Sequence, residues 1–198
     1  MKKTLLLLLF LPLAFFATSC DKDEDDNNEP IDTEVKEFKF LDVSSYTEWT
    51  YFSFSKNEVV VVEDFANSLE WDIAFHRADV RTNGGASGKG KGEALDSGKK
   101  EWDQVTTVPT SGFKKDEVGK ITTKFTGEGV EEDDQPFSQV LSAWLDVDTS
   151  NPPPVYTLSN SIYVVKAANG KVVKIHFYDN KNQKDKNGAV SFKYQYLN

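Results

Sequence analysis

A glycine- and lysine-rich segment offers the first residues that could bind a ligand. Residues 85–92 read GASGKGKG, which is close to the loop that cradles phosphates in nucleotide-binding proteins. That loop needs a Ser or Thr after its lysine to hold Mg²⁺, whereas Lys91 is followed by Gly92. No helical pattern follows, so no helix N-terminus would face a phosphate. We therefore interpret the segment as a glycine-rich turn.

Two acidic stretches could bind a cation. Residues 146–150 (DVDTS) have the alternating oxygen ligands of a calcium loop, but they lack its later glycine and its closing glutamate. Residues 131–134 (EEDD) could complete such a site, although a run of charges is more often a solvated loop. The sequence therefore predicts no metal site.

The chain has two histidines, and either could be a ligand or a general base. His76 is expected on the face of its strand opposite Trp71 and Phe75, and His176 on the face opposite Ile175. Such residues are more often surface or hydrogen-bonded strand histidines. No Ser-His-Asp arrangement or paired-carboxylate spacing accompanies them, so the sequence predicts a binding protein and not an enzyme.

The N-terminus has the pattern of a bacterial lipoprotein signal. Residues 1–3 are short and basic, residues 4–16 are apolar, and small residues 17–19 precede Cys20, the single cysteine of the chain. The apolar run is too short for a comfortable bilayer span. We expect cleavage after residue 19 and a lipid on the Cys20 thiol. The alternative is a plain secretory signal with an incidental cysteine, and in either case no internal disulfide can form.

Residues 20–35 are expected to form a tether between the lipid and the domain. Residues 21–30 (DKDEDDNNEP) are highly charged and have too little apolar surface to fold. An acidic run after a lipidated cysteine resembles the signal of lipoproteins displayed on the outer face of the outer membrane. The alternative is a solvated spacer on a protein that faces the periplasm. The net charge of −9 argues against a nucleic-acid partner, because phosphate contacts need clustered Lys and Arg.

Residues 36–198 are predicted to form one all-β domain of mostly antiparallel sheet, with at most one short helix. Residues 161–168 and 171–178 flank Asn169-Gly170, a strong hairpin signal. Residues 134–143 could hold the short helix or a loop. Further strands are expected from alternating apolar residues at 49–54, 71–76, 121–125 and 190–196. The four consecutive valines within residues 58–63 could be a strand buried on both faces or an ambiguous apolar run.

Long polar connections interrupt the predicted strands. One covers residues 82–100, and two others cover residues 127–136 and 146–154. Long connections in a compact domain are usually functional or mobile. These stretches are therefore candidate functional loops of the β domain.

An ordered series of motifs runs from about Phe38 to the C-terminus. The motifs are residues 46–54 (YTEWTYFSF), 71–77 (WDIAFHR), 79–90 (DVRTNGGASGKG), 106–110 (TTVPT), 156–159 (YTLS), 170–174 (GKVVK) and 192–196 (FKYQY). This series resembles the HmuY family of haem-binding lipoproteins, antiparallel β proteins with a clamp of loops around haem, which they pass to a TonB-dependent outer-membrane receptor. The resemblance therefore implies long loops that form a ligand clamp, haem or a related porphyrin as ligand, such a receptor as partner, and an outer-membrane location.

The ligand loops depart from the family pattern. Well-known members hold the iron with two His or two Met side chains, and residues 127–136 and 146–154 contain neither. Thr149 is nearest the expected ligand position, and Asp148, Glu131 and Tyr156 are the other clamp candidates. The resemblance therefore predicts porphyrin capture by weaker or different contacts. The alternative is a divergent relative that binds a non-haem ligand or a protein partner at the same clamp.

Overall fold

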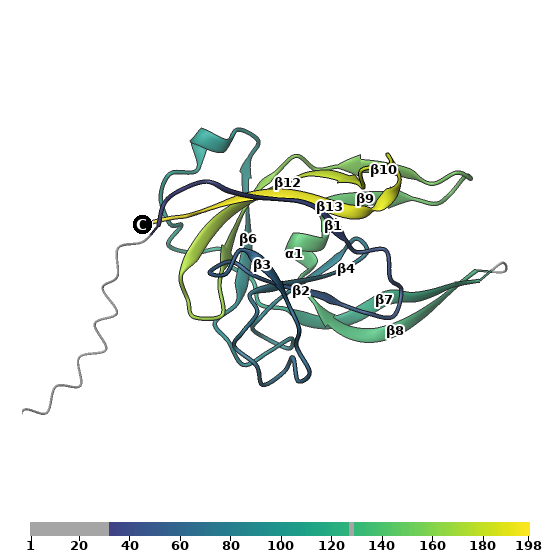
Figure 1. Cartoon of the computed structure of the whole chain (residues 1–198), viewed down its shortest axis with the longest axis horizontal. Coiled ribbons are helices and arrows are strands. Elements are labelled where there is room, and N and C mark those ends of the chain that lie inside the picture. Colours follow the sequence, from purple (N-terminus) through teal and green to yellow (C-terminus); the bar gives the residue numbers. More distant parts are fainter. Residues whose placement is uncertain (1–31, 127–128) are drawn as a thin grey trace, which may run out of the picture. The chain divides into compact units, whose positions relative to one another are not determined.

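The computed structural model describes residues 32–126 and 129–198 (Figure 1). The predicted signal peptide, Cys20 and residues 21–31 of the tether lie outside the described residues. Within the described ranges, no helix is long and apolar enough to cross a membrane.

The described chain is mostly antiparallel β-sheet, as predicted. All strand pairs among the described residues are antiparallel, and the helices there are one short α-helix and one 3₁₀ turn. The elements are β1 (Lys36–Asp42), β2 (Thr50–Ser53), β3 (Glu58–Val60), β4 (Ile73–His76), β5 (Asp79–Thr82), β6 (Glu93–Lys99), η1 (Trp102–Gln104), β7 (Glu117–Thr126), β8 (Gly129–Phe137), α1 (Gln139–Ser142), β9 (Leu145–Asp148), β10 (Val155–Leu158), β11 (Ile162–Lys166), β12 (Val172–Lys181) and β13 (Asn187–Tyr196).

A five-stranded sheet in the order β1-β13-β12-β11-β6 supplies one side of the core. The period-two residues of β13 are buried, as the alternation of residues 190–196 predicted. The predicted hairpin between β11 and β12 also forms, and its turn is closed by a hydrogen bond from the Gly170 amide to the Ala167 carbonyl (2.9 Å). Gly170 has a φ of +90°, a conformation that favours glycine.

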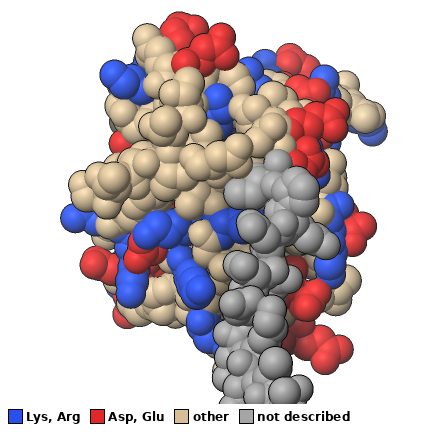
Figure 2. Space-filling view, turned by 90° about the vertical axis from the view of Figure 1, so that its left-hand side faces the viewer, with Lys and Arg blue, Asp and Glu red and all other residues tan. Residues whose placement is uncertain are grey.

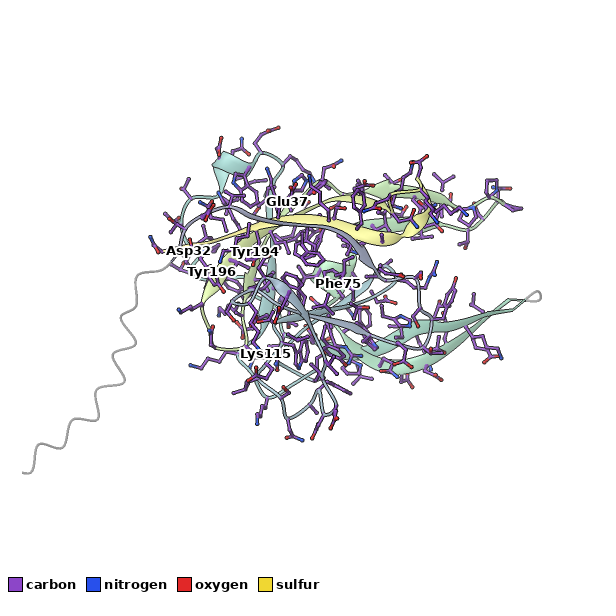
Figure 3. The ribbon with its side chains drawn as sticks, in the orientation of Figure 1. Asp32, Glu37, Phe75, Lys115, Tyr194 and Tyr196 are labelled. Atoms are coloured by element: carbon purple, nitrogen blue, oxygen red, sulfur yellow. The ribbon has the colours of Figure 1, made fainter. Side chains whose placement is uncertain are left out.

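A four-stranded sheet in the order β3-β2-β4-β5 supplies the other side. Its Phe52 and Phe75 rings lie 5.1 and 5.7 Å from the ring of Phe192 on β13, centroid to centroid. Figure 3 shows Phe75 between the two sheets, among the side chains that fill the interior. The aromatic residues that the sequence placed on alternating strand positions therefore join the two sheets.

The valine run at residues 58–63 does not form the buried strand that its composition suggested. β3 ends at Val60 and lies at the edge of its sheet, Val59 is 44% exposed and Val61 is 95% exposed. The chain leaves the sheet before the run is complete, so its later residues have nothing to pack against. Four consecutive valines therefore do not by themselves predict a buried strand.

The polar stretch at residues 82–100 is not one long loop. Its second half forms β6, which pairs with β11, and its first half is fixed by the carboxylate of Asp116. This carboxylate accepts hydrogen bonds from the Thr82 amide (2.8 Å) and the Ser87 hydroxyl (2.6 Å). Burial raises the pKa of Asp116 to about 6.

Both stretches expected as clamp loops are β-hairpins. Residues 127–136 lie mostly in β8, which pairs with β7, and residues 146–154 lie partly in β9, which pairs with β10. The acidic side chains of β8 face lysines of β7: Lys120 pairs with Asp134 (3.0 Å) and Lys124 with Glu131 (2.6 Å). Opposite charges on facing strands stabilise a pair of strands that has little apolar content.

The short helix expected within residues 134–143 is α1, a single turn. It begins after Ser138, whose hydroxyl accepts a hydrogen bond from the Leu141 amide (3.3 Å) and so caps the helix. Residues 134–137 belong to β8 instead. The helix leads directly into Trp144 and β9, and it therefore places the second hairpin.

Candidate ligand cleft between two hairpins

A cleft of about 440 Å³ lies between the β7–β8 and β9–β10 hairpins. Figure 1 shows these hairpins extending from the same end of the β domain, at the right of the view. The turn between β4 and β5 and the residues around the β12–β13 connection complete the walls. The volume is within the range of roughly 300–1,000 Å³ that is typical of small-molecule sites.

Strand alternation decides which hairpin residues line the cleft. On β8 the lining residues are Val130 and Glu132, and on β9 and its following loop they are Leu145, Val147 and Thr149. Successive side chains of a strand point to opposite faces, so every second residue faces the cleft. Strands β8, β9 and β10 therefore offer one face to a ligand, whereas three successive residues of β7, Lys120, Ile121 and Thr122, line the cleft.

The walls of the cleft are apolar and include a fixed aromatic ring. Trp144 is 1% exposed, and its indole N–H donates a hydrogen bond to the Ala78 carbonyl (2.9 Å), which holds the ring in place. The other apolar lining residues are Val43, Ala78, Ile121, Val130, Leu145, Val147, Pro154 and Ala189. A flat, apolar ligand would be removed from water on both sides here.

Charged groups lie among these apolar residues. Arg77 donates a hydrogen bond to the Ser44 carbonyl (2.9 Å), and its guanidinium lies 4.0 Å from the ring centroid of Tyr46, which also lines the cleft. Lys120 contributes an ammonium from β7 that already pairs with Asp134 (3.0 Å), and Asp79 and Glu132 add two carboxylates to the lining. Arg77 has no carboxylate partner among the described residues, so it could pair with an acidic group of a ligand, and Lys120 could do so by exchanging Asp134 for that group.

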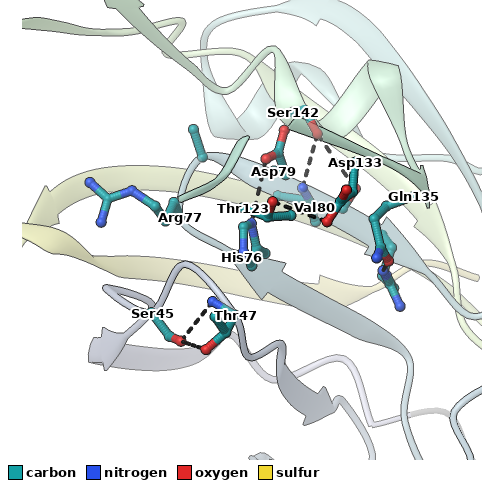
Figure 4. A network of polar contacts seen from close by, with 12 residues as sticks. Ser45, Thr47, His76, Arg77, Asp79, Val80, Thr123, Asp133, Gln135 and Ser142 are labelled. Atoms are coloured by element: carbon teal, nitrogen blue, oxygen red, sulfur yellow. Dashed lines mark hydrogen bonds and ion pairs between the residues drawn. The ribbon is translucent and has the colours of Figure 1, made fainter. Parts of the chain in front are cut away.

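His76 does not line the cleft but lies directly behind it. It is 1% exposed, and its Nδ1 is 3.7 Å from a carboxylate oxygen of Asp79, too far for a hydrogen bond. Figure 4 shows this pair beside Thr123 of β7. Nδ1 has no hydrogen-bond partner among the described residues, so the expectation of a surface or hydrogen-bonded strand histidine was wrong for His76.

His176 lies in the middle of the five-stranded sheet. It pairs with Ile162 of β11 and Lys193 of β13, and burial lowers its pKa. It does not line the cleft either. Neither histidine is therefore placed to contact a ligand there.

The cleft offers few ligands to an iron atom. Within residues 32–126 and 129–198, no His, Met or Cys lines it, whereas two phenols, Tyr46 and Tyr156, do. Nor do the described residues hold any group of three His, Cys, Asp or Glu side chains that could bind a metal. Tyrosine is a known haem ligand, so Tyr156 of β10 and Tyr46 are the side chains that could reach iron.

The four clamp candidates divide by strand face. Thr149 and Tyr156 line the cleft, while Glu131 and Asp148 do not. Glu131 pairs with Lys124, and a carboxylate oxygen of Asp148 accepts a hydrogen bond from the Ser150 amide (2.9 Å).

Sequence reasoning missed several lining residues, among them Trp144, Glu132 and Val147. The alternation in residues 145–149 was visible, but the stretch was interpreted as a loop, in which alternation has no meaning. Arg77 and Tyr46 belong to the family motifs, but the sequence did not predict that they line the clamp.

A β domain that extends two hairpins around an apolar cleft is the architecture of a small-molecule-binding clamp. The family model described as HmuY protein matches residues 45–194, and the chain belongs to this family. No curated protein matches the chain.

Solved structures have the same fold. A Bacteroides vulgatus protein described as HmuY-like and haem-binding is 27% identical, with a TM-score of 0.67 over 84% of this chain and 93% of that one. A Bacteroides fragilis protein described as a lipoprotein is 28% identical, with a TM-score of 0.66 over 83% and 89%. The apo HmuY analogue of Tannerella forsythia is 26% identical, with a TM-score of 0.63 over 86% and 98%.

Proposed function

We propose that the cleft between the hairpins binds haem or a related porphyrin. The observation that carries this proposal is the apolar wall around Trp144 and Val147, flanked by Arg77 and Lys120. A porphyrin has two apolar faces and two carboxylates, so this combination of walls and cations fits it. Family membership and the names of the related structures support the same ligand.

The macrocycle, and not the iron, supplies most of the binding in this proposal. Burial of apolar surface contributes roughly 25 cal/mol per Å², so a buried porphyrin face can give useful affinity without a metal bond. The cleft has phenols in place of the His or Met pairs implied by the family resemblance. In this proposal the chain binds and releases a porphyrin.

A charge placed on the apolar wall should abolish most of this binding. Val147→Asp puts a carboxylate against the macrocycle, and we expect affinity for haem to fall by about tenfold or more, since each 1.4 kcal/mol changes it roughly tenfold. The measurement is a haem titration, followed by absorbance, of the soluble chain (residues 20–198 with Cys20→Ser, which carries no lipid).

The matched control is Val155→Asp on the neighbouring strand β10. Val155 is 58% exposed and does not line the cleft, so the Val155→Asp variant should bind haem with the affinity of the unchanged chain. Equal losses in both variants would contradict a site on this wall. If the unchanged chain binds neither haem nor protoporphyrin, the clamp binds a non-haem ligand or a protein partner instead. The lack of His, Met and Cys among the described lining residues favours this alternative.

We further propose that a lipid on Cys20 anchors the protein to the outer membrane, with the domain at the cell surface, from where it transfers its ligand to a TonB-dependent receptor. The signal pattern of residues 1–19 and the acidic residues 21–30 support the anchor and the location. The lipoprotein description of the Bacteroides fragilis structure is consistent with both.

Cys20→Ser should prevent lipid attachment. Without the thiol there is no atom to carry the lipid, so the variant should stay as an unprocessed precursor or appear in the soluble fraction. The measurement is fractionation with immunoblotting, which separates precursor from mature chain by size. A processed Cys20→Ser protein that remains in the membrane fraction would contradict the anchor.

A further inference from the structure

A second concave site lies on the side of the domain away from the cleft hairpins. It has a volume of about 460 Å³ and is lined by three lysines, one glutamate, Asn169 and four glycines. We call it the lysine pocket: Gly85, Gly90, Lys91, Gly92, Glu93, Lys115, Lys166, Asn169 and Gly170. Figure 3 labels Lys115, and Figure 2, which views the left-hand side of Figure 1, shows Lys and Arg side chains gathered on that face.

The pocket is positively charged although the whole chain carries a net charge of −9. Its one carboxylate, on Glu93, pairs with Lys166. Among the described residues, the lining side chains make no other ion pair, so the ammonium groups of Lys91 and Lys115 have no carboxylate partner there. Charges of one sign in a concave site attract a counter-ion of the other sign.

Three separate segments bring the lysines together. Lys91 lies in the glycine-rich segment, Lys115 precedes β7 and Lys166 ends β11. The Lys91 side chain lies against the Gly170 turn, because a Cβ at Gly170 would be 3.0 Å from Lys91 Cδ. The tertiary structure therefore makes a cluster of cations that is not apparent from their spacing in the sequence.

The glycines form a rigid floor and do not act as a phosphate-binding loop. The Gly92 amide donates to the Asn83 carbonyl (2.8 Å), and the Lys91 amide donates to the Ala168 carbonyl (2.9 Å). A Cβ on Gly92 would lie 2.5 Å from the Asn83 backbone, so only glycine fits. With these amides already used, an anion would be held by the ammonium groups.

The pocket also lies on the end of the domain where the described chain begins. Figure 3 labels Asp32 and Lys115 on the same side, opposite the cleft hairpins. Residues 20–32 could span at most about 40 Å when extended. If Cys20 carries a lipid, as proposed above, this end of the domain stays close to the bilayer surface.

We propose that the lysine pocket binds phosphate groups of lipid headgroups on the membrane that carries the anchor. The lysines would then hold this end of the domain on the membrane and direct the cleft away from it, toward the medium. Charges are screened over about 8–10 Å at physiological salt, so acidic residues farther than this from the headgroups oppose the interaction little.

Vesicle co-sedimentation of the soluble chain tests this inference without the lipid anchor. The probe is phosphatidylcholine vesicles with roughly one third lipid A, which carries phosphate groups, against vesicles of phosphatidylcholine alone. We expect binding only to the phosphate-bearing vesicles, with loss as salt rises from about 0.05 to 0.5 M. Lys91→Glu with Lys115→Glu should weaken it by about tenfold or more.

The matched control is Lys184→Glu with Lys186→Glu, which makes the same change in net charge on the exposed turn between β12 and β13. This variant should bind the vesicles like the unchanged chain, and circular dichroism should show both variants folded. Equal weakening in both variants, or no binding of the unchanged chain, would overturn the inference. Binding of inorganic pyrophosphate without vesicle binding would also overturn it, in favour of a free anion.

Haem titration of the same variants separates this inference from the proposed function. Neither lysine lines the cleft, so Lys91→Glu with Lys115→Glu should leave haem affinity unchanged. Vesicle binding can therefore fail while haem binding persists, and the reverse can also occur.

Discussion

Thr149→His should turn the cleft into a strong haem site. Thr149 lines the cleft on the loop after β9, and histidine in that place brings an imidazole nitrogen to the ligand. We expect affinity for haem to rise about 100-fold, which corresponds to roughly 3 kcal/mol, and the Soret band to move toward that of low-spin iron. Affinity for protoporphyrin should not change, because it has no iron to bind.

The unchanged chain sets the baseline for this experiment. With no His, Met or Cys among the lining residues, haem and protoporphyrin should bind within about tenfold of each other, and the haem complex should lack a six-coordinate low-spin spectrum. The measurement is a paired titration of both ligands, followed by absorbance. An iron preference above about 100-fold would instead show an axial ligand, which Tyr156→Phe would identify.

Asp148→His is the matched control. It places the same side chain one residue earlier, on the face of β9 that does not line the cleft. This variant should keep the spectrum and affinity of the unchanged chain. If both variants gain low-spin character, the imidazole acts without regard to strand face, and the assignment of Thr149 to the cleft wall is wrong.

Phe192→Ala should cost roughly 3–5 kcal/mol of unfolding free energy. Phe192 is fully buried, and its ring contacts aromatic rings from both sheets, including Phe52 (5.1 Å), Phe75 (5.7 Å) and Phe177 (6.1 Å) between centroids. Its removal leaves a cavity where the two sheets meet. Urea unfolding followed by tryptophan fluorescence gives the measurement.

Phe40→Ala is the control for this loss. Phe40 is 38% exposed, so the same truncation should cost less than about 1 kcal/mol. A comparable loss in both variants would place the stability outside the aromatic core. Haem binding by folded Phe192→Ala at low temperature would show in addition that the cleft does not depend on this side chain.

The sequence by itself determined the elements whose signals are local. Alternation along β13 predicted its buried face, because a strand with one face in the core needs apolar residues at every second position. Asn169-Gly170 marked the β11–β12 hairpin, because few residues tolerate the backbone that such a turn needs. The ordered motifs also predicted the HmuY family, which the match over residues 45–194 confirmed.

Only the tertiary structure decided which residues share a site. Residues 127–136 looked like a loop because their charges have no local partners, but lysines of β7 pair with them across the hairpin. Val61 is exposed because the chain leaves the sheet after Val60, and the buried ring of His76 packs against Trp49 at 5.2 Å between ring centroids. These outcomes depend on contacts between distant parts of the chain, and composition and spacing do not record such contacts.

The division of the clamp candidates has the same cause. Asp148 and Thr149 are neighbours in sequence and equally polar, yet only Thr149 lines the cleft. A strand reverses the direction of its side chains at each residue, so a site is defined by register, and register is set by the partner strand. The sequence supplied the segments of the clamp, and strand pairing selected the residues within them.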